Sequence, residues 1–292
     1  MRARLGYLGF RVAMGLVGAL PRNVAIAMGS GLARFVAPFL RGRFAMAVRH
    51  ASRLGAEDPV ERALEMFAAY GRYWAETFWV RPRRRAEIES STTLEGREWL
   101  EKAKAGGRGI ILALPHMGNW EFAGPVATTV GLDLVAVAEN LANEHIRGWF
   151  VDLRRRMDID IVLATGTASV MRELETRLNS GGSVALLCDR DLRGKGVSVP
   201  FFGEETTMPA GPVALALKTG SPILPAAAYF GPKGSHRIVV HPPVELPEAA
   251  NRRAALRVGT ARVAAALERL IAAAPEQWHM LQPNWPSDRA VT

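Results

Sequence analysis

The chain has 292 residues, of which 49% are hydrophobic and 22% are charged. This length suits one large α/β domain, or a small helical domain joined to an α/β body, and the composition excludes wholesale disorder. The formal net charge is +9 and the sequence pI is about 10.4, which indicates an anionic partner such as nucleic acid, an acidic membrane or a phosphorylated substrate. A GC-rich genome would give the same arginine bias without functional meaning.

Residues 1–40 are apolar, but four residues interrupt them: Arg11, Pro21, Arg22 and Arg34. No uncharged stretch therefore approaches the roughly 18–20 residues that span a bilayer. A signal peptide is also considered, but no convincing small-residue cleavage site follows. We expect an interfacial anchor with apolar helix faces in lipid and arginines on phosphates. The alternative is a pair of ordinary core helices.

The first 80 residues are predicted to be helical. An aromatic and apolar stripe recurs at spacings near three and four residues, at Met66, Phe67, Tyr70, Tyr73, Trp74, Phe78 and Trp79. We expect this helix to pack on the body of the protein. Pro82 helps to end it, and the basic cluster at 81–85 suits a solvated turn or a lipid-phosphate contact equally.

From residue 90, apolar runs of strand length alternate with helical segments. Strands are predicted at 109–114, 134–137, 159–163, 183–187, 223–229 and 237–241. Helices are predicted at 143–157, 168–178, 210–219 and 252–273. This alternation indicates an α/β sheet with helices on its faces, and the continuous apolar strands suit a sheet covered on both sides.

His116 follows the strand predicted at 109–114, and the carboxyl ends of strands are where open α/β sheets bind ligands. Gly118 and Asn119 are good helix-start residues, which puts Glu121 in a first helical turn. Five residues advance about 500° around a helix. His116 and Glu121 can therefore meet only if Glu121 reaches back, in which case it would fix the imidazole tautomer while His116 takes a proton from a hydroxyl. A loop histidine beside a helix-capping glutamate is the alternative.

The segment Cys188-Asp189-Arg190-Asp191 also follows a strand, so it should reach the same edge of the sheet. Its two acids suit a charge relay, a metal site or an internal ion pair. No histidine or further cysteine stands beside them at metal-ligand spacing, so we expect no zinc site, whereas magnesium stays open. Cys188 is the single cysteine, which excludes a disulfide framework within the chain and fits a cytoplasmic setting. We interpret it as a buried small hydrophobe.

Two further patterns have both a functional and a structural interpretation. The apolar segment 196–203 suits the wall of a long acyl-chain site, or simply the core. Arg147, Arg154 and Arg155 fall close to one helical face. They would bind a phosphate or form a solvated basic surface.

Together these residues resemble a known family, the bacterial lipid A biosynthesis acyltransferases and their actinobacterial relatives. Four motifs carry the resemblance: Leu114-Pro115-His116 through Trp120-Glu121, Cys188-Asp189-Arg190-Asp191, Val199-Pro200-Phe201-Phe202-Gly203 and Pro275-Glu276-Gln277-Trp278-His279. The aromatic segment at 70–74 is similar to the family's helix before the catalytic domain. The resemblance covers most of the chain.

The resemblance implies a glycerolipid-acyltransferase-like α/β fold, a mixed sheet flanked by helices, with an N-terminal helical membrane-associating segment. We expect that segment at 1–85 and the acyltransferase domain at 86–292. The activity implied is transfer of a fatty acyl group from a thioester to a glycolipid hydroxyl at the cytoplasmic face of the inner membrane.

Carried over residue by residue, the resemblance implies His116 as the base, Glu121 as its partner and Asp189 as a further acid. Many members have aspartate at the position of Glu121. Glu139 and Arg154 look like the acceptor-side and phosphate-side polar residues. The other candidate substrate-binding residues are Asn119, Trp120, Arg190 and Asp191.

The carboxyl end at 280–285 lacks the His-Arg-Arg-Phe-like run usual in lipid A enzymes. Segments 189–192 and 208–212 look more like the branch that acylates phosphatidylinositol mannosides. The expected donor is acyl-coenzyme A, and no metal or other cofactor is expected. The expected partners are a membrane glycolipid and an anionic membrane surface. A lipid A acyltransferase and a non-catalytic lipid-binding protein are the alternatives.

Nucleic-acid binding rests on charge alone, because the sequence shows no basic and aromatic interleaving on a readable module and no zinc-finger spacing. We therefore expect no nucleic-acid partner. The sequence also lacks a Gly-x-Ser-x-Gly nucleophile elbow, so we expect direct transfer, with backbone amides near Gly118 and the following helix start holding the oxyanion.

Overall fold

The computed structural model describes residues 2–138, 140–164, 167–191, 194–246, 248 and 251–289. Four helices come first: α1 (Arg2–Ala19), α2 (Arg22–Val36), α3 (Arg41–Arg53) and α4 (Pro59–Trp79), with the 3-10 turn η1 (Ala37–Phe39) after α2. The prediction of a helical first 80 residues is confirmed. Asp58 caps the start of α4, where its carboxylate accepts the amides of Val60 and Glu61, and the helix ends shortly before Pro82.

An α/β body follows. Its strands are β1 (Thr92–Glu95), β2 (Ile110–Leu114), β3 (Leu134–Ala138), β4 (Ile159–Leu163), β5 (Ser183–Leu187), β6 (Val197–Phe201), β7 (Glu204–Met208), β8 (Ile223–Phe230) and β9 (His236–Val240). Its helices are α5 (Arg85–Ser90), α6 (Arg97–Ala105), α7 (Ala123–Thr129), α8 (Glu144–Arg155), α9 (Thr167–Asn179), α10 (Gly211–Thr219), α11 (Arg252–Ala272) and α12 (Pro286–Arg289). Short 3-10 turns are η2 (Pro82–Arg84), η3 (Trp120–Phe122), η4 (Pro232–Gly234) and η5 (Pro275–Gln277).

Seven strands form one mixed sheet in the order β1-β9-β8-β2-β5-β3-β4. Strands β8, β2, β5, β3 and β4 run parallel, β9 is antiparallel to β8, and β1 is parallel to β9. Strands β6 and β7 form a separate antiparallel hairpin. The predicted α/β class and mixed sheet are confirmed, and all six predicted strands are present. The short β1, α6, α7 and β7 were not predicted.

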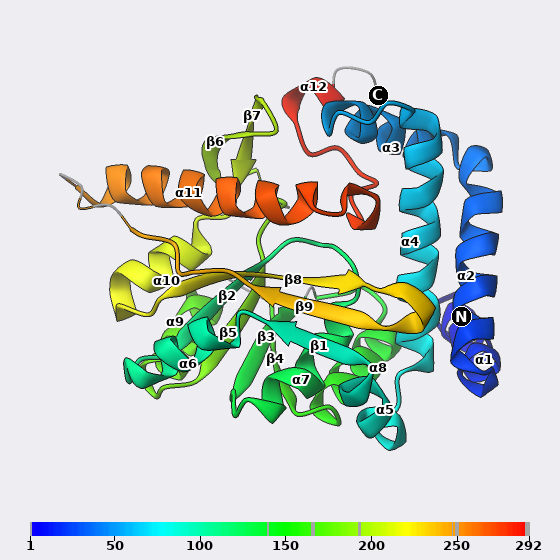
Figure 1. The fold of residues 1–292 in the computed structure, drawn as a ribbon, viewed down its shortest axis with the longest axis horizontal. Helices are drawn as coiled ribbons and strands as arrows, with labels where there is room; N and C mark the ends of the chain where they lie inside the picture. The colour runs from blue at the N-terminus through cyan, green and yellow to red at the C-terminus, as the bar shows by residue number, and fades with distance from the viewer. Residues whose placement is uncertain are drawn as a thin grey trace.

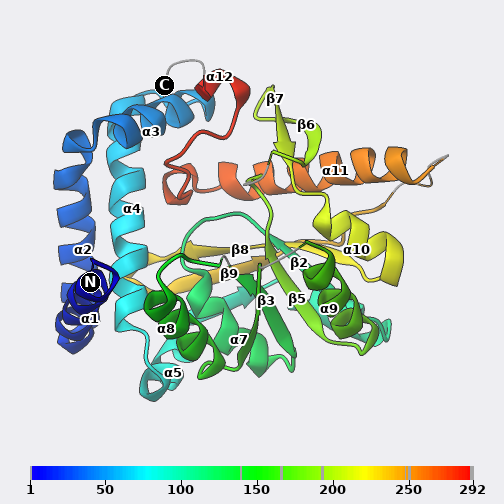
Figure 2. The ribbon, with the colours of Figure 1, turned by 180° about the vertical axis from the view of Figure 1, so that it is seen from behind.

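Helices cover both faces of the sheet (Figures 1 and 2). On one face, α9, α10 and α11 contribute Leu174, Leu215 and Leu267 to the larger apolar core. On the other face, α6 and α7 contribute Leu100 and Ala127 to a second core. All five residues of β2 are buried, which explains why its sequence is a continuous apolar run rather than an alternating one.

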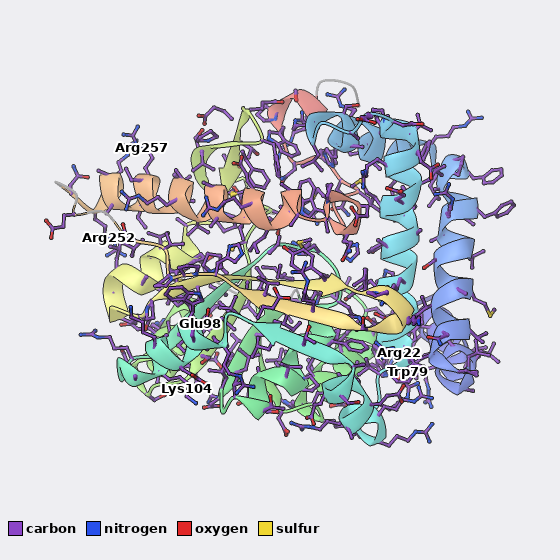
Figure 3. All side chains as sticks on the ribbon, in the orientation of Figure 1. Arg22, Trp79, Glu98, Lys104, Arg252 and Arg257 are labelled. Carbon is purple, nitrogen blue, oxygen red and sulfur yellow. The ribbon has the colours of Figure 1, made fainter. Side chains whose placement is uncertain are left out.

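Helix α2 runs beside α4 at one end of the sheet (Figure 1). Their backbones touch at Gly29 and Gly71, where a Cβ on Gly71 would lie 2.2 Å from the Gly29 carbonyl oxygen. Near the end of this contact Arg22 of α2 lies over the ring of Trp79 at 5.3 Å (Figure 3). The N-terminal helices therefore pack on α4 and also contact the body directly, where Arg22 of α2 donates to His236 of β9. The predicted boundary between 1–85 and 86–292 stays a prediction.

The outward faces of α1, α2 and η1 expose apolar side chains: Leu8, Val12, Leu16, Val24, Met28, Leu32, Phe35 and Phe39. Phe35 is 70% exposed and Phe39 is 72% exposed. We call this set the apolar stripe. Among the described residues no single helix is long and apolar enough to cross a membrane, and the pair 22–39 and 41–53 meets those criteria only jointly, with a bend of 102°.

The basic cluster after α4 has a structural role at two positions. Arg81 donates to the carbonyls of Phe78 and Met14, and Arg84 donates to the carbonyl of Gly18. These side chains satisfy the carbonyls that helix C-termini leave without intrahelical partners. For Arg81 and Arg84, both expected interpretations, a solvated turn and a lipid-phosphate contact, are replaced by capping of α1 and α4.

Candidate active site

Strands β2 and β5 bring the two predicted functional segments together. Leu114 at the end of β2 lies opposite Leu187 at the end of β5 in a parallel register. His116 and Asp189 each stand two residues beyond these positions, so both reach the carboxyl edge of the sheet. The prediction that the two segments share one edge is confirmed.

His116 pairs with Asp189. The imidazole Nδ1 lies 2.6 Å from Asp189 Oδ1, and the His116 amide donates to Oδ2 at 2.9 Å. The indole Nε1–H of Trp278 donates to Oδ2 at 2.7 Å. Burial alone would raise the pKa of the Asp189 carboxyl, but the charge and hydrogen bond of His116 and the bond from Trp278 lower the pKa below its usual range.

This pattern fixes the tautomer of His116. An ionised carboxylate only accepts hydrogen bonds, so Nδ1 of His116 must carry the proton that faces Asp189. The lone pair of neutral His116 is then on Nε2. The His116 side chain is 30% exposed whereas Asp189 is fully buried. The pair can therefore take a proton at Nε2 and hold the resulting imidazolium beside a buried negative charge.

The expected contact between Glu121 and His116 is wrong. Glu121 accepts two hydrogen bonds from Arg154, at 3.1 Å from Nε and 2.6 Å from Nη2, and is itself buried. The reason is local. Asn119 starts the turn η3 by accepting the Glu121 amide, and the turn directs the Glu121 carboxylate toward α8 instead of back along the chain. Asp189 takes the role that sequence spacing gave to Glu121.

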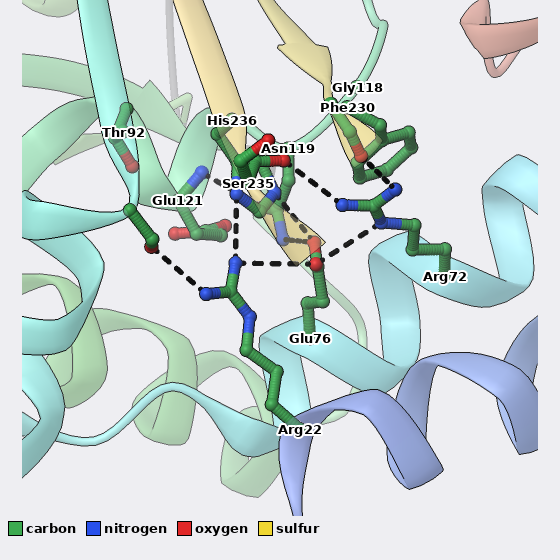
Figure 4. Close-up of polar contacts among 12 residues, drawn as sticks. Arg22, Arg72, Glu76, Thr92, Gly118, Asn119, Glu121, Phe230, Ser235 and His236 are labelled. Atoms are coloured by element: carbon green, nitrogen blue, oxygen red, sulfur yellow. Dashed lines mark hydrogen bonds and ion pairs between the residues drawn. The ribbon is translucent and has the colours of Figure 1, made fainter. Parts of the chain in front are cut away.

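Asn119 belongs to a buried charged cluster rather than to a substrate surface. Its side-chain amide donates to Glu76 at 3.2 Å (Figure 4). Glu76 of α4 also meets Arg72 at 3.2 Å, Arg22 at 3.6 Å and His236 at 2.8 Å. Because Asn119 is fully buried, its predicted role in substrate binding is replaced by a structural one: it ties the turn after His116 to α2, α4 and β9.

The cluster also fixes the state of His236. Arg22 donates to Nδ1 of His236 at 2.9 Å, so that nitrogen must be the acceptor, and Nε2–H donates to Glu76. Burial lowers the pKa of His236 below its ordinary value, despite the opposing effect of Glu76. His236 is therefore a neutral bridge between two charged side chains.

A cleft of about 600 Å³ opens beside His116. Trp120 stands edge-on to the His116 ring at 5.9 Å between centroids, and the cleft is also lined by Arg147, Arg154 and Arg190. Of the predicted substrate-binding residues, the structure thus brings Trp120, Arg154 and Arg190 to the cleft beside His116.

Other predicted residues lie elsewhere. Arg155 lines a separate surface pocket near β4, not the cleft of Arg147 and Arg154, because helix α8 turns it to another face. The carboxylate of Asp191 accepts the amide of Gly196 at 2.6 Å, which makes it part of the loop before β6. Glu139 lies outside the described residues.

A second cavity, which we call the apolar cavity, adjoins the cleft. Trp120, Val137, Arg154 and Leu187 line both spaces. The rest of its wall is largely aliphatic and includes Leu94, Leu100, Leu112, Leu114, Leu132 and Leu134. It lies on the face of the sheet that α6 and α7 cover.

The segment 196–203 is not the wall of this cavity. Phe201 in β6 is buried against the rings of Trp278 and Trp285 on the face that α11 covers. Of its two expected interpretations, acyl-site wall or core, the structure supports core. The apolar cavity lies on the opposite face of the sheet, beside the second core.

The amides expected to hold an oxyanion are engaged elsewhere. The amide of Gly118 donates to the carbonyl of Gln277 at 3.0 Å, and the amide of Glu121 donates to the side chain of Asn119 at 3.1 Å. That expectation is therefore wrong for both groups.

Some residues that contact the site or its supporting cluster were not predicted as site residues, among them Trp278, Glu76 and His236. Trp278 stood in a motif that served only for the family resemblance. Glu76 stands three residues after Tyr73 on the apolar stripe of a predicted packing helix, where a carboxylate needs a buried partner. That position was a usable signal. His236 had none, because its partners come from α2 and α4.

Comparison with known proteins assigns the chain to a class, the acyltransferases. The sequence model of the bacterial lipid A biosynthesis acyltransferase family matches residues 2–287, and the chain belongs to that family. A phosphatidylinositol mannoside acyltransferase of Mycobacterium tuberculosis strain H37Rv is 36% identical over 223 residues, covering 75% of this chain and 69% of the relative. The protein of the same name from Mycolicibacterium smegmatis is 32% identical over 287 residues, covering 96% of this chain and 91% of the relative.

Proposed function

We propose that this acyltransferase moves a long fatty acyl group from acyl-coenzyme A to a mannose hydroxyl of a phosphatidylinositol mannoside, with His116 as the general base. The observation that carries the proposal is the orientation of His116. Its Nδ1 is committed to buried Asp189, which leaves Nε2 as the basic atom of a ring at the edge of the cleft. The names of the relatives support the acceptor.

The chemical step is a direct transfer. His116 Nε2 takes the proton of the acceptor hydroxyl as its oxygen attacks the thioester carbonyl carbon. The carbon–sulfur bond then breaks, and the departing thiolate takes the proton from the imidazolium. The products are an ester and free coenzyme A thiol. Burial raises the pKa of Cys188, which supports a step without a cysteine acyl-enzyme.

The two adjoining spaces fit the two parts of an acyl thioester. The apolar cavity would take the hydrocarbon chain, because its lining is aliphatic apart from Trp120, Glu121, Gly124 and Arg154. Arg147 and Arg190 line the cleft and would meet phosphate groups of the donor or of the acceptor. The shared lining at Trp120 and Leu187 would then lie near the thioester carbonyl.

The test uses palmitoyl-coenzyme A with purified wild-type protein and His116→Ala. The acceptors are a phosphatidylinositol mannoside and, in parallel, a Kdo-lipid IVA-type precursor, with products identified by mass spectrometry. We expect acylation of the mannoside by the wild type and a loss of at least about 10³-fold in the variant. His241→Ala is the matched control, because the amide of His241 donates to the carbonyl of Pro225 near the start of β8.

Unchanged transfer by a folded His116→Ala protein would remove the base assignment. Acylation of the lipid A precursor alone would replace the acceptor. Binding of lipid without release of thiol by the wild type would favour a non-catalytic lipid-binding protein.

For the location, we propose that the protein docks peripherally on the anionic cytoplasmic face of the inner membrane through the apolar stripe. Arg11 of α1 is exposed, and so are Arg41 and Arg43 at the start of α3, directly after η1, which suits contact with lipid phosphates. Each exposed phenylalanine would contribute about 1.5–3 kcal/mol on burial. Phe35→Ser with Phe39→Ser should therefore weaken binding to phosphatidylinositol-containing vesicles at least about tenfold. Leu217→Ser, on α10, is the control, and equal losses in both proteins would refute the surface.

A further inference from the structure

The segment 275–279 packs against the turn that carries His116. Met117 and Trp278 form an isolated antiparallel bridge. The amide of Gly118 donates to the Gln277 carbonyl at 3.0 Å, and the amide of His279 donates to the His116 carbonyl at 2.7 Å. This turn is thus paired, residue against residue, with a segment about 160 positions later in the chain.

The ring of His279 adds a third contact to the same turn. Its Nε2 lies 2.7 Å from the carbonyl oxygen of Gly118. A carbonyl only accepts, so Nε2 must carry the proton. The other nitrogen, Nδ1, is buried and has no hydrogen-bond partner among the described residues, which favours the neutral ring because a buried charge without a partner is costly. Burial and the nearby His116 lower the pKa of His279 to about 4, in agreement with the geometry.

The His279 ring is surrounded by aromatic rings, so its hydrogen bond to the Gly118 carbonyl is the polar contact that distinguishes it from an apolar side chain. Rings of Tyr70, Tyr73 and Trp120 lie within 5.4–6.1 Å of the His279 centroid. Burying a nitrogen without a partner is unfavourable and uncommon. A wholly apolar side chain would avoid that cost but would leave the Gly118 carbonyl without its donor. The histidine is therefore better explained by what it does to the turn than by stability.

The backbone at Gly118 is closely packed and has no room for a side chain. Its φ is +57°, and a Cβ there would lie 1.6 Å from the carbonyl oxygen of Ala228 in β8. The turn is pressed against β8 on one side and held by His279 on the other. A group that fixes the Gly118 carbonyl therefore fixes the backbone from which the His116 ring extends.

We propose that His279 is a positioning residue for His116, acting as a neutral donor to the Gly118 carbonyl. The proposal rests on the proposed function of His116 as the base. In this proposal the segment 275–279 positions both residues of the pair, because the adjacent Trp278 donates a hydrogen bond to Asp189. One short segment then places both members of the catalytic pair. A displacement of about 1 Å at a reacting group is enough to cost about 10²-fold in rate.

The experiment compares His279→Leu, which removes the donor, with His279→Gln, whose terminal amide can place an N–H near the position of Nε2. His241→Leu is the control, because it makes the same change at a histidine at the far end of β8. For each folded protein, kcat and KM for palmitoyl-coenzyme A and the pH profile of kcat/KM are measured. We expect His279→Leu to lower kcat about 10–100-fold with KM within about threefold, and His279→Gln to recover most of that loss.

Several results would overturn the proposal. One is kcat in His279→Leu within about threefold of wild type. Another is an equal loss in the Leu and Gln variants, or a loss confined to KM. If His279→Leu does not fold, His279→Asn replaces it, since its shorter amide does not reach Gly118, and the same comparison with Gln decides. Absence of acyl transfer by the wild type would instead defeat the proposed function. Loss of activity in His116→Ala together with normal kcat in His279→Leu would defeat this inference alone.

Discussion

Replacement of Asp189 by asparagine tests the central pair most directly, because the structure fixes how the new amide must sit. Oδ2 of Asp189 accepts two N–H groups, from the His116 amide at 2.9 Å and from Trp278 at 2.7 Å. Oδ1 accepts one, from His116 Nδ1. The asparagine oxygen should occupy the position with two donors. Its NH₂ group would then face Nδ1 of His116.

That arrangement forces the wrong tautomer. Nδ1 of His116 would have to accept from the amide, which moves the imidazole proton to Nε2 and removes the base from the cleft. The same substitution in a Ser–His–Asp triad lowers kcat by about 10⁴. We expect a loss of about 10³–10⁴-fold here, equivalent to about 4–5.5 kcal/mol of transition-state stabilisation at about 1.36 kcal/mol per decade.

The assay follows release of coenzyme A thiol with a phosphatidylinositol mannoside acceptor at fixed pH, with circular dichroism to establish folding. Asp160→Asn is the matched control, because its carboxylate is exposed on β4 and pairs with Arg177. A folded Asp189→Asn protein whose kcat stays within about tenfold of wild type would refute the tautomer reasoning.

Four further outcomes follow from the same structure. Gly118→Ala should lower the free energy of unfolding by at least about 2 kcal/mol, since its φ is +57° and its Cβ would overlap backbone; a denaturation midpoint like that of wild type would contradict this. Leu132→Phe fills part of the apolar cavity and should lower the ratio of kcat/KM for palmitoyl over myristoyl donors about tenfold. The reason is that burial of each of the two excluded methylenes would contribute about 0.8 kcal/mol. An unchanged ratio would exclude this cavity as the chain site. Glu121→Gln should destabilise the fold by about 3 kcal/mol by leaving Arg154 without its buried counter-charge, and chemical denaturation measures it against wild type. The pKa of His279 is about 4 in the folded protein and about 6.5 in the unfolded chain. Between these pH values only the unfolded chain binds the proton, so the free energy of unfolding of the wild type should fall as pH falls, by about 3 kcal/mol in all. His279→Gln should lack this contribution, and parallel curves of unfolding free energy against pH for the two proteins would disprove it.

Local periodicity was enough for most of the fold. The six apolar runs became strands and the predicted helices formed close to their expected bounds, because a buried strand or an amphipathic helix is specified by its own side chains. The short strands β1 and β7 were missed, since their sequences, TTLE and EETTM, are mostly polar and lack the apolar run that marked the predicted strands. For the segment 196–203 the sequence did not decide between core and the wall of an acyl-chain site, because an apolar, strand-like sequence does not specify which face of a sheet it will cover.

The location of the site also followed from sequence. Parallel strands end at one edge, so His116 and Asp189 had to lie near each other once both were assigned to strand ends. What the sequence could not supply was the choice of partners. Spacing paired His116 with Glu121, five residues away, whereas the structure pairs His116 with Asp189 and Glu121 with Arg154.

The sequence by itself thus predicted the class of fold, the edge of the sheet where the candidate site lies and His116 as the proposed base. Tertiary structure alone decided the state of that base and what holds it. Both acids are buried, but Asp189 meets Nδ1 of His116 directly and receives a further donor from Trp278, whereas Glu121 is paired with Arg154. The choice depends on donors and desolvation contributed by segments far apart in the chain, and no local pattern encodes such contributions.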